Sequence, residues 1–235
     1  MTRVLVPVRI LEGVSPPPGL IDLLGTVDVT VMGYHVLPEQ TGPDQASDQY
    51  EERANDALDD IVAEFEAAGG SADKRLVFTH ERGATIKRVA ADTESDAFAI
   101  LGATGPVDKL IVPLSGDVAV EAITSFVATL VGDRDIAVTL FLASADAAGS
   151  DEASLDDAAA TLRGAGIEVT TKTAEGRPFD ALVEAAAGHD AVVMGERAPS
   201  FRSLLFGEET DRVAAETVGP VLVVRNPETE PADDP

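Results

Sequence analysis

The residues best suited to chemistry follow a short apolar run late in the chain. Gly195 comes directly after the apolar run Ala191–Met194, and Gly207 precedes a segment with helical spacing of apolar residues. Backbone N–H groups at the start of a helix can bind a phosphate group. Arg197 and Arg202 lie between the two glycines and could add positive charge. The pattern predicts a strand, a glycine-containing loop and a helix that together could hold an anion.

Two other residues of the same loop oppose phosphate binding. Ala198 adds a methyl group where close approach of the backbone to a phosphate favours glycine. Glu208 places a carboxylate in the first helical turn, which suits the helix dipole but occupies the place of a phosphate. Two unit charges about 4 Å apart repel by about 4 kcal/mol at an effective dielectric of about 20, which corresponds to about three decades of affinity. The two arginines could bind phosphate or pair with Glu208 and Glu209, and we favour pairing.

Apolar runs and helical periodicity alternate along the chain, which is typical of an α/β protein with doubly wound parallel sheets. We predict strands at Arg3–Val8, Val27–Leu37, Arg75–Thr79, Ala97–Leu101, Lys109–Leu114, Ile136–Ala143, Ile167–Thr173, Ala191–Met194 and Val221–Val224. We predict helices at Leu20–Leu24, Asp48–Ala68, Gly83–Ala91, Val118–Val131, Ser154–Arg163 and Pro178–Ala187, and another after Gly207.

This pattern of elements occurs twice. The first strand of each copy has a similar sequence, RVLVPV at residues 3–8 and KLIVPL at residues 109–114. Gly83 and Gly102 are each followed 93 residues later by another glycine. A constant offset across a helix and a strand indicates a duplicated unit.

The two copies differ in completeness, because only a few residues separate Gly102 from the next strand. We therefore predict two tandem domains that pack as a pseudo-dimer. Residues 1–107 form a degenerate domain that lacks the last helix–strand unit, and residues 108–226 form the more complete one. Residues 227–235 are an acidic flexible tail.

The composition is strongly acidic, with 42 acidic and 17 basic residues and a net charge of −25. The acid is spread along the chain, which indicates adaptation to high salt, where screening relieves self-repulsion; we expect a halophilic source. Nucleic-acid binding is disfavoured, since no basic stripe offsets phosphate repulsion. The chain has no cysteine and no apolar run long enough to span a membrane. We expect a cytoplasmic protein without membrane insertion.

The remaining reactive side chains form no catalytic or metal-binding motif. His35, His80 and His189 are far apart and lack the spacing of metal ligands. Ser200 and Ser203 have no His/Asp motif that would make either one a nucleophile. Paired aspartates in the predicted helices suit solvated faces rather than acid/base pairs. We expect no enzyme activity.

Several of these segments together resemble the universal stress protein family: the VPV and VPL first strands, VVMGER at residues 192–197, the helix start at Gly207 and the terminal PVLVVRN. The resemblance implies a five-stranded parallel sheet for a complete domain, and dimerisation through the last strand, which is frequent in the family. Family members that bind ATP carry a Gly-x2-Gly-x9-Gly-Ser/Thr loop and an Asp after the first strand. Here Ala198 replaces the second glycine, eight residues instead of nine follow it, and Glu208 replaces the Ser/Thr. Arg9 and Ser115 occupy the two Asp positions.

The resemblance implies a nucleotide site at the carboxyl ends of the second-copy strands. Its candidate residues are Leu114, Ser115, Met194, Gly195, Arg197, Ala198, Arg202, Gly207 and Glu208. We expect a non-enzymatic, stress-associated or regulatory protein with a degenerate site and no cofactor. It would act by dimerising through Val221–Val224 and by contacting an unidentified protein partner. One alternative is a working ATP or AMP site in the second copy, and a second is an enzyme or cofactor carrier on a related α/β fold.

Overall fold

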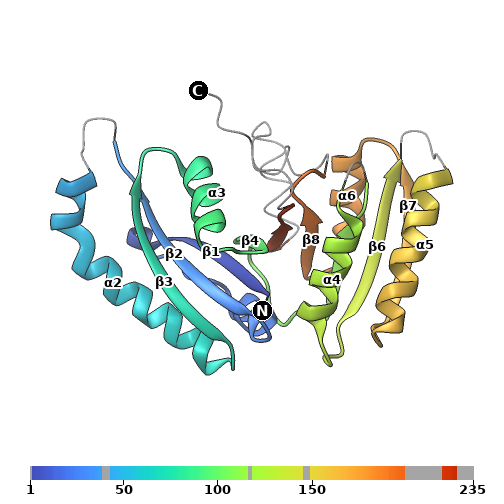
Figure 1. Cartoon of the computed structure of the whole chain (residues 1–235), viewed down its shortest axis with the longest axis horizontal. Helices are drawn as coiled ribbons and strands as arrows, with labels where there is room; N and C mark the ends of the chain where they lie inside the picture. Colours follow the sequence, from blue (N-terminus) through green and yellow to red (C-terminus); the bar gives the residue numbers. More distant parts are fainter. Residues whose placement is uncertain (1, 39–42, 116–117, 145–148, 199–218, 227–235) are drawn as a thin grey trace.

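The structure is a computed structural model that describes residues 2–38, 43–115, 118–144, 149–198 and 219–226. One sheet of nine strands runs through the molecule, in the order β3-β2-β1-β4-β9-β8-β5-β6-β7 (Figure 1). The strands are β1 (Arg3–Arg9), β2 (Asp28–Val36), β3 (Ser71–Thr79), β4 (Ala97–Ile100), β5 (Lys109–Pro113), β6 (Ala137–Ser144), β7 (Val169–Glu175), β8 (Ala191–Gly195) and β9 (Val221–Val224). All neighbouring strands are parallel except β4 and β9.

Helices cover both faces of the sheet. They are α1 (Pro18–Leu24), α2 (Pro43–Ala67), α3 (Arg82–Asp92), α4 (Val120–Val131), α5 (Gly149–Gly164) and α6 (Pro178–Ala186), with a short 3-10 helix η1 (Ile10–Glu12). Apolar residues of α1, α2, α4 and α5 pack on one face with Val4 and Val6 of β1. Those of α3 and α6 pack on the other face with Leu5. The alternation along β1 follows from the period of a strand, and apolar residues on both faces explain its continuous apolar sequence.

Within the described residues the predicted element types are confirmed, and the helix predicted after Gly207 lies outside those residues. Most boundaries agree within two residues, but three starts differ by more, among them that of α5, which begins at Gly149 instead of Ser154. The second helix begins at Pro43 instead of Asp48, and β3 begins at Ser71 instead of Arg75. The polar start of β3 conceals a strand because this is the edge of the sheet, where alternate side chains are exposed. Its backbone nevertheless pairs with β2 along its whole length. Pro18, the last of three prolines, fits as the first residue of α1 because that position needs no N–H donor.

The α/β class with parallel strands is confirmed, but the two predicted sheets are one. We call β1–β4 with α1–α3 the first half and β5–β9 with α4–α6 the second half. Strand order read inward from each edge is the same in both halves, third, second, first and fourth. The second half adds β9, which pairs with β8 on one side and antiparallel with β4 on the other. The strand that the first half lacks is thus supplied by the second half.

This arrangement corrects the prediction that Val221–Val224 forms a dimer contact. Both edges of β9 are paired inside the chain, and its side chains are buried. A strand with no free edge cannot add a strand from a second chain. That the chain forms a homodimer at all stays a prediction.

A matching pair of aspartates supports the correspondence between the halves. The Oδ2 atom of Asp96 accepts a hydrogen bond from the backbone N–H of Arg3, at 2.8 Å. The Oδ2 atom of Asp190 accepts from the N–H groups of Lys109 and Asp108, at 2.9 and 3.0 Å. In each half, one carboxylate before the fourth strand therefore holds the start of the first strand.

Strand register refines the offset between the halves. The second residue of β1 pairs with Ala97, as the second residue of β5 pairs with Ala191. These matching positions are 94 residues apart, so Gly195 corresponds to Leu101 rather than to Gly102. The pairing of Gly102 with Gly195 by a 93-residue offset is wrong by one residue.

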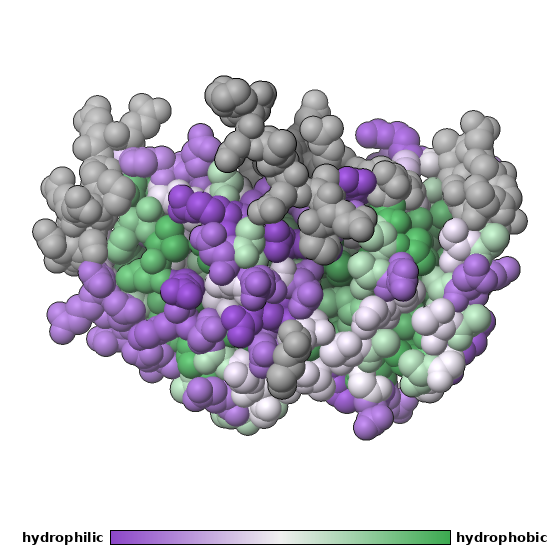
Figure 2. Space-filling model, in the orientation of Figure 1, coloured by the Kyte–Doolittle hydropathy of each residue, from purple (hydrophilic) through white to green (hydrophobic). Residues whose placement is uncertain are grey.

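Acidic side chains lie on solvated helix faces, as predicted. Asp59 and Asp60 of α2 and Asp156 and Asp157 of α5 are exposed. Asp59 forms an ion pair with Lys74 of β3. Figure 2 shows hydrophilic residues over α2 and β3, at the lower left of the view. None of the described helices is both long and apolar enough to cross a membrane.

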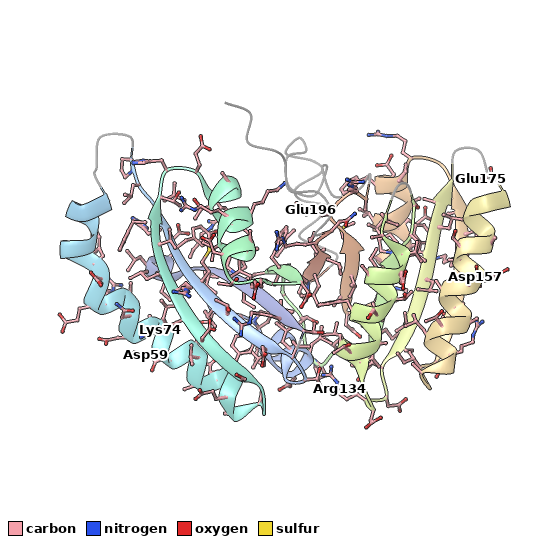
Figure 3. All side chains as sticks on the ribbon, in the orientation of Figure 1. Asp59, Lys74, Arg134, Asp157, Glu175 and Glu196 are labelled. Atoms are coloured by element: carbon pink, nitrogen blue, oxygen red, sulfur yellow. The ribbon has the colours of Figure 1, made fainter. Side chains whose placement is uncertain are left out.

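One arginine of the second half fastens α1 of the first half. Arg134 donates hydrogen bonds to the carbonyl oxygens of Asp22 and Leu23, both at 2.9 Å, and to that of Leu130 in α4 (Figure 3). These carbonyl groups belong to the last turns of two helices, which a cation stabilises. Burial lowers the pKa of Arg134, and the Asp22 carboxylate opposes this shift. The side chain thus links both halves through helix ends.

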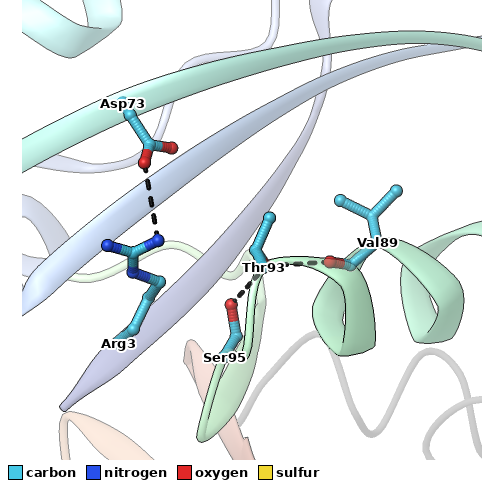
Figure 4. Close-up of polar contacts among 5 residues, drawn as sticks. All are labelled: Arg3, Asp73, Val89, Thr93 and Ser95. Carbon is cyan, nitrogen blue, oxygen red and sulfur yellow. Dashed lines mark hydrogen bonds and ion pairs between the residues drawn. The ribbon is translucent and has the colours of Figure 1, made fainter.

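The end of α3 is held by buried hydroxyl groups. Thr93 Oγ1 donates to the carbonyl oxygen of Val89 at 2.8 Å and lies 2.8 Å from Ser95 Oγ (Figure 4). Arg225, which follows β9, donates to the carbonyl oxygens of Ala90 and Ser95 at 3.0 and 2.9 Å. The second half therefore contacts the last turn of α3 as well as that of α1.

Candidate functional site

The carboxyl ends of β5 and β8 bring the predicted site residues together. The two strands are neighbours in the sheet, and the chain leaves them in opposite directions, toward β6 and toward β9. Open parallel sheets bind ligands at such a switch point. Leu114 and Met194 are buried in the cores of opposite faces, so they position the strand ends and do not offer polar groups.

The family resemblance places Ser115 at the position of the Asp that ATP-binding members carry. Its side chain is buried, and its hydroxyl oxygen accepts a hydrogen bond from the N–H of Ala143 at 2.7 Å. The neighbouring N–H of Leu114 donates to the carbonyl oxygen of Phe141 at 2.8 Å. The serine therefore joins the ends of β5 and β6. A carboxylate would offer a ligand two acceptor oxygens, whereas the serine has a single hydroxyl oxygen that already accepts from Ala143.

Gly195 is explained by packing. A Cβ atom at this position would lie 3.1 Å from Cδ1 of Ile123 and 3.4 Å from Val118. The start of α4 and the segment just before it thus lie directly against the end of β8, and a side chain at residue 195 would crowd Ile123 and Val118. The close contact that favours a glycine at this position is made with α4 of the protein itself rather than with a ligand.

The residues after Gly195 also have partners within the fold. Ala198 is buried in the core under α6, and its N–H donates to the carbonyl oxygen of Gly195 at 3.0 Å. Glu196, labelled in Figure 3, forms an ion pair with Lys87 of α3 at 3.1 Å. Arg197 also takes part in an interaction within the chain. Arg202, Gly207 and Glu208 lie outside the described residues, so their part in a nucleotide site stays a prediction.

The corresponding end of the first half is built differently. Arg9, which matches Ser115, donates through Nε to the Tyr34 hydroxyl at 3.3 Å and pairs with Glu12 at 3.1 Å. These hydrogen bonds, that to Tyr34 first, raise the pKa of Arg9. A Cβ atom on Gly102 would lie 2.3 Å from the carbonyl oxygen of Gly219. The backbone before β9 therefore occupies the space beside the end of β4, where a glycine loop of the first half would stand.

A cavity of about 220 Å³ lies beside α3 of the first half. It is lined by Arg82, Gly83, Ile86, Lys87, Phe98, Ala99 and Ile100, and we call it the α3–β4 cavity. No motif in the sequence predicts this cavity. One signal for it was available, because residues 82–91 contain three cations and no acid in a chain of net charge −25.

A larger cavity of about 540 Å³ lies between α4 and the end of α3. Its polar lining includes the carboxylates of Glu94 and Asp96 and the guanidinium of Arg225. Arg225 is already bonded to two carbonyl oxygens of the first half. Although this cavity is larger than the α3–β4 cavity, it is less suited to an anion, because two of its lining residues are acidic and its arginine is already bonded.

His35 and His80 lie at the neighbouring ends of the paired strands β2 and β3, whereas His189 lies in the second half. Among the described residues, no cluster of three or more potential ligands could hold a metal ion. His80 Nδ1 lies 3.2 Å from the carbonyl oxygen of Leu37, and His189 Nε2 lies 2.9 Å from Thr139 Oγ1. Burial is the main cause that lowers the pKa of His189. None of these histidines lies at the end of β5 or β8.

Comparison with known proteins supports the family resemblance for the second half. Residues 121–225 match the profile of the universal stress protein family, from the start of α4 to the end of β9. No curated protein matches the chain.

One solved structure shares the fold of the whole chain, and two others are similar to a lesser degree. A universal stress protein from Archaeoglobus fulgidus DSM 4304 is 17% identical, with 99% of this chain and 97% of that chain covered and a TM-score of 0.64. A universal stress protein in complex with cAMP is 22% identical over 51% of this chain and 97% of its own, with a TM-score of 0.41. The cytoplasmic domain of a prokaryotic cation chloride cotransporter is 11% identical over 94% of each chain, with a TM-score of 0.49. The chain thus carries a universal stress protein family domain at residues 121–225, within a nine-stranded fold similar to that of a complete universal stress protein.

Proposed function

We propose that this chain is a non-enzymatic, stress-associated or regulatory protein whose nucleotide site in the second half is degenerate. The observation that carries the proposal is the use of site residues for packing and strand joining. Gly195 accommodates Ile123 of α4, and Ser115 accepts a hydrogen bond from Ala143. The loop that would bind phosphate also carries Glu208 where the family's ATP-binding members have Ser or Thr.

We further propose that the two halves are a tandem pair acting as a pseudo-dimer inside one chain. The repeated strand order and the matching Asp96 and Asp190 contacts support this. Sharing β9 closes the edge of the first half. Surfaces other than this strand would then contact the protein partner.

A working ATP or AMP site is the second candidate. It is favoured by the position of the β5 and β8 ends, which meet at the switch point where open parallel sheets bind ligands. The two candidates differ in what the protein carries after purification. Freshly purified protein should be denatured, and its released small molecules should be counted by mass spectrometry. We expect far less than one nucleotide per chain, and a content close to one would support the second candidate instead.

We also infer adaptation to high salt from the net charge of −25. Like charges destabilise the compact state, and molar salt screens them. The midpoint of thermal unfolding should therefore rise as KCl is increased into the molar range. A midpoint that stays flat or falls would mean that the acidic composition has another cause.

A further inference from the structure

We propose that the α3–β4 cavity binds a small organic anion with an apolar body, such as an aromatic carboxylate or an aryl phosphate. The cavity belongs to the first half. Because β4 and β9 are antiparallel, the end of β4 at Ile100 lies beside Val221 at the start of β9, whereas Gly195 at the end of β8 lies beside Val224 at the end of β9. The cavity therefore has a different set of lining residues from the proposed nucleotide site of the second half, and Lys87 reaches toward that site through Glu196.

The charge of α3 is opposite to that of the rest of the protein. Arg82, Lys87 and Arg88 lie in this one helix, and its first turn contains no acidic residue. Arg82 is the first residue of the helix, where the helix dipole disfavours a cation. The position of Arg82 thus does not help α3 to fold. An anion bound beside Arg82 would offset the unfavourable interaction between this cation and the helix dipole.

Arg82 is held in place without being neutralised. Its guanidinium lies 5.8 Å from the ring centre of Tyr34, which is a buried side chain. The Tyr34 hydroxyl also accepts a hydrogen bond from Nε of Arg9. Within the described part of the chain, no carboxylate lies within ion-pair distance of Arg82. A cation–π contact of this kind contributes about 0.5–1 kcal/mol and leaves the charge in place. Arg82 can therefore pair with an anion from solution.

The rest of the lining suits an apolar body. Ile86 of α3 and Phe98 of β4 are buried core residues, and Ile100 is half-buried at the end of β4. Pockets for drug-sized ligands have volumes of about 300–1,000 Å³. At about 220 Å³ the cavity is smaller than these, so it suits a ligand with one ring or a short branched chain.

Lys87 links this cavity to the second half. Its Nζ atom lies 3.1 Å from the Glu196 carboxylate, next to Gly195 at the end of β8. A bound anion would compete with Glu196 for Lys87. Removing the Glu196 charge should therefore strengthen anion binding in the first half.

The test uses the full-length chain and phenyl phosphate, benzoate and neutral benzyl alcohol as probes at one fixed KCl concentration. Binding is measured by calorimetry and by saturation-transfer NMR. We expect both anions to bind and benzyl alcohol to bind at least about tenfold more weakly, because a charge-assisted hydrogen bond is lost. Equal binding of the neutral probe, or no binding of either anion at millimolar concentration, would overturn the proposal.

Variants locate the binding site. Arg82→Gln should weaken phenyl phosphate binding at least about tenfold, while Glu196→Gln should tighten it. Arg177→Gln is the matched control, because Arg177 is an exposed arginine beside α6, the corresponding helix of the second half. Unchanged thermal unfolding should show that each variant is folded. An equal loss of phenyl phosphate affinity in Arg82→Gln and Arg177→Gln would show a general effect of removing positive charge and would also overturn the proposal.

Discussion

The ends of the first and fourth strands are built differently in the two halves. In the second half, Ser115 and Gly195 serve strand joining and helix packing. In the first half, Arg9 and Arg82 both contact Tyr34, beside a cavity with an apolar floor. The same order of strands thus supports two different chemical environments. Strand order alone does not determine what a site binds, and the side chains at the strand ends decide it.

The largest effect should come from a charge in the strand that the halves share. Leu222→Lys places a cation in the middle of β9, where the leucine is completely buried and β4 and β8 lie on either side. We expect a loss of at least about 4 kcal/mol in the free energy of unfolding, seen as a collapse of the thermal midpoint. Thr171→Lys, on the exposed edge strand β7, is the control and should change little. A folded Leu222→Lys protein that is merely monomeric would mean that β9 is a surface edge.

A smaller effect should come from the arginine that joins helix ends of both halves. Arg134→Ala leaves the carbonyl groups of Asp22 and Leu23 without this donor. Hydrogen bonds from a charged donor each contribute about 1.5–3 kcal/mol, so we expect a loss of about 3 kcal/mol in urea unfolding. Arg177→Ala should be nearly neutral, since Arg177 is exposed. Equal stability of both variants would mean that Arg134 does not fasten the halves.

The smallest stability effect compares the matching aspartates. Asp190→Ala removes an acceptor for two backbone N–H groups, whereas Asp96→Ala removes an acceptor for one. We expect losses of about 2 and about 1 kcal/mol in the free energy of unfolding, in that order. Urea titration of both variants measures the difference. A reversed order would show that the two contacts are not equivalent.

Much of the fold could be predicted from the sequence, because each apolar run and each helical period reports a local preference. The ends of β9 match the prediction, since Val221–Val224 is a short apolar run after Gly219-Pro220. The pairing of β9 with β4 could not be predicted, because pairing between distant strands leaves no local signal. The start of β3 was missed for a related reason, as an edge strand tolerates polar residues.

The candidate site was predictable as a position but not as a set of contacts. The sequence placed Ser115 and Gly195 at the ends of two strands, and the structure makes those strands neighbours. The sequence could not show that Gly195 packs against Ile123, because that contact joins residues far apart in sequence. Arg82 was missed because its significance depends on Tyr34, which β2 brings beside α3.

The central claim is that the nucleotide site of the second half is degenerate, and calorimetric titration with ATP tests it most directly. The wild-type chain is compared with Glu208→Ser, which removes the carboxylate from the phosphate position. Glu66→Ser, which removes the same charge from an exposed position on α2, is the control. We predict weak or no binding by the wild type and by Glu66→Ser, and a gain of up to about three decades in affinity for Glu208→Ser. Tight binding of ATP by the wild-type chain would contradict the account.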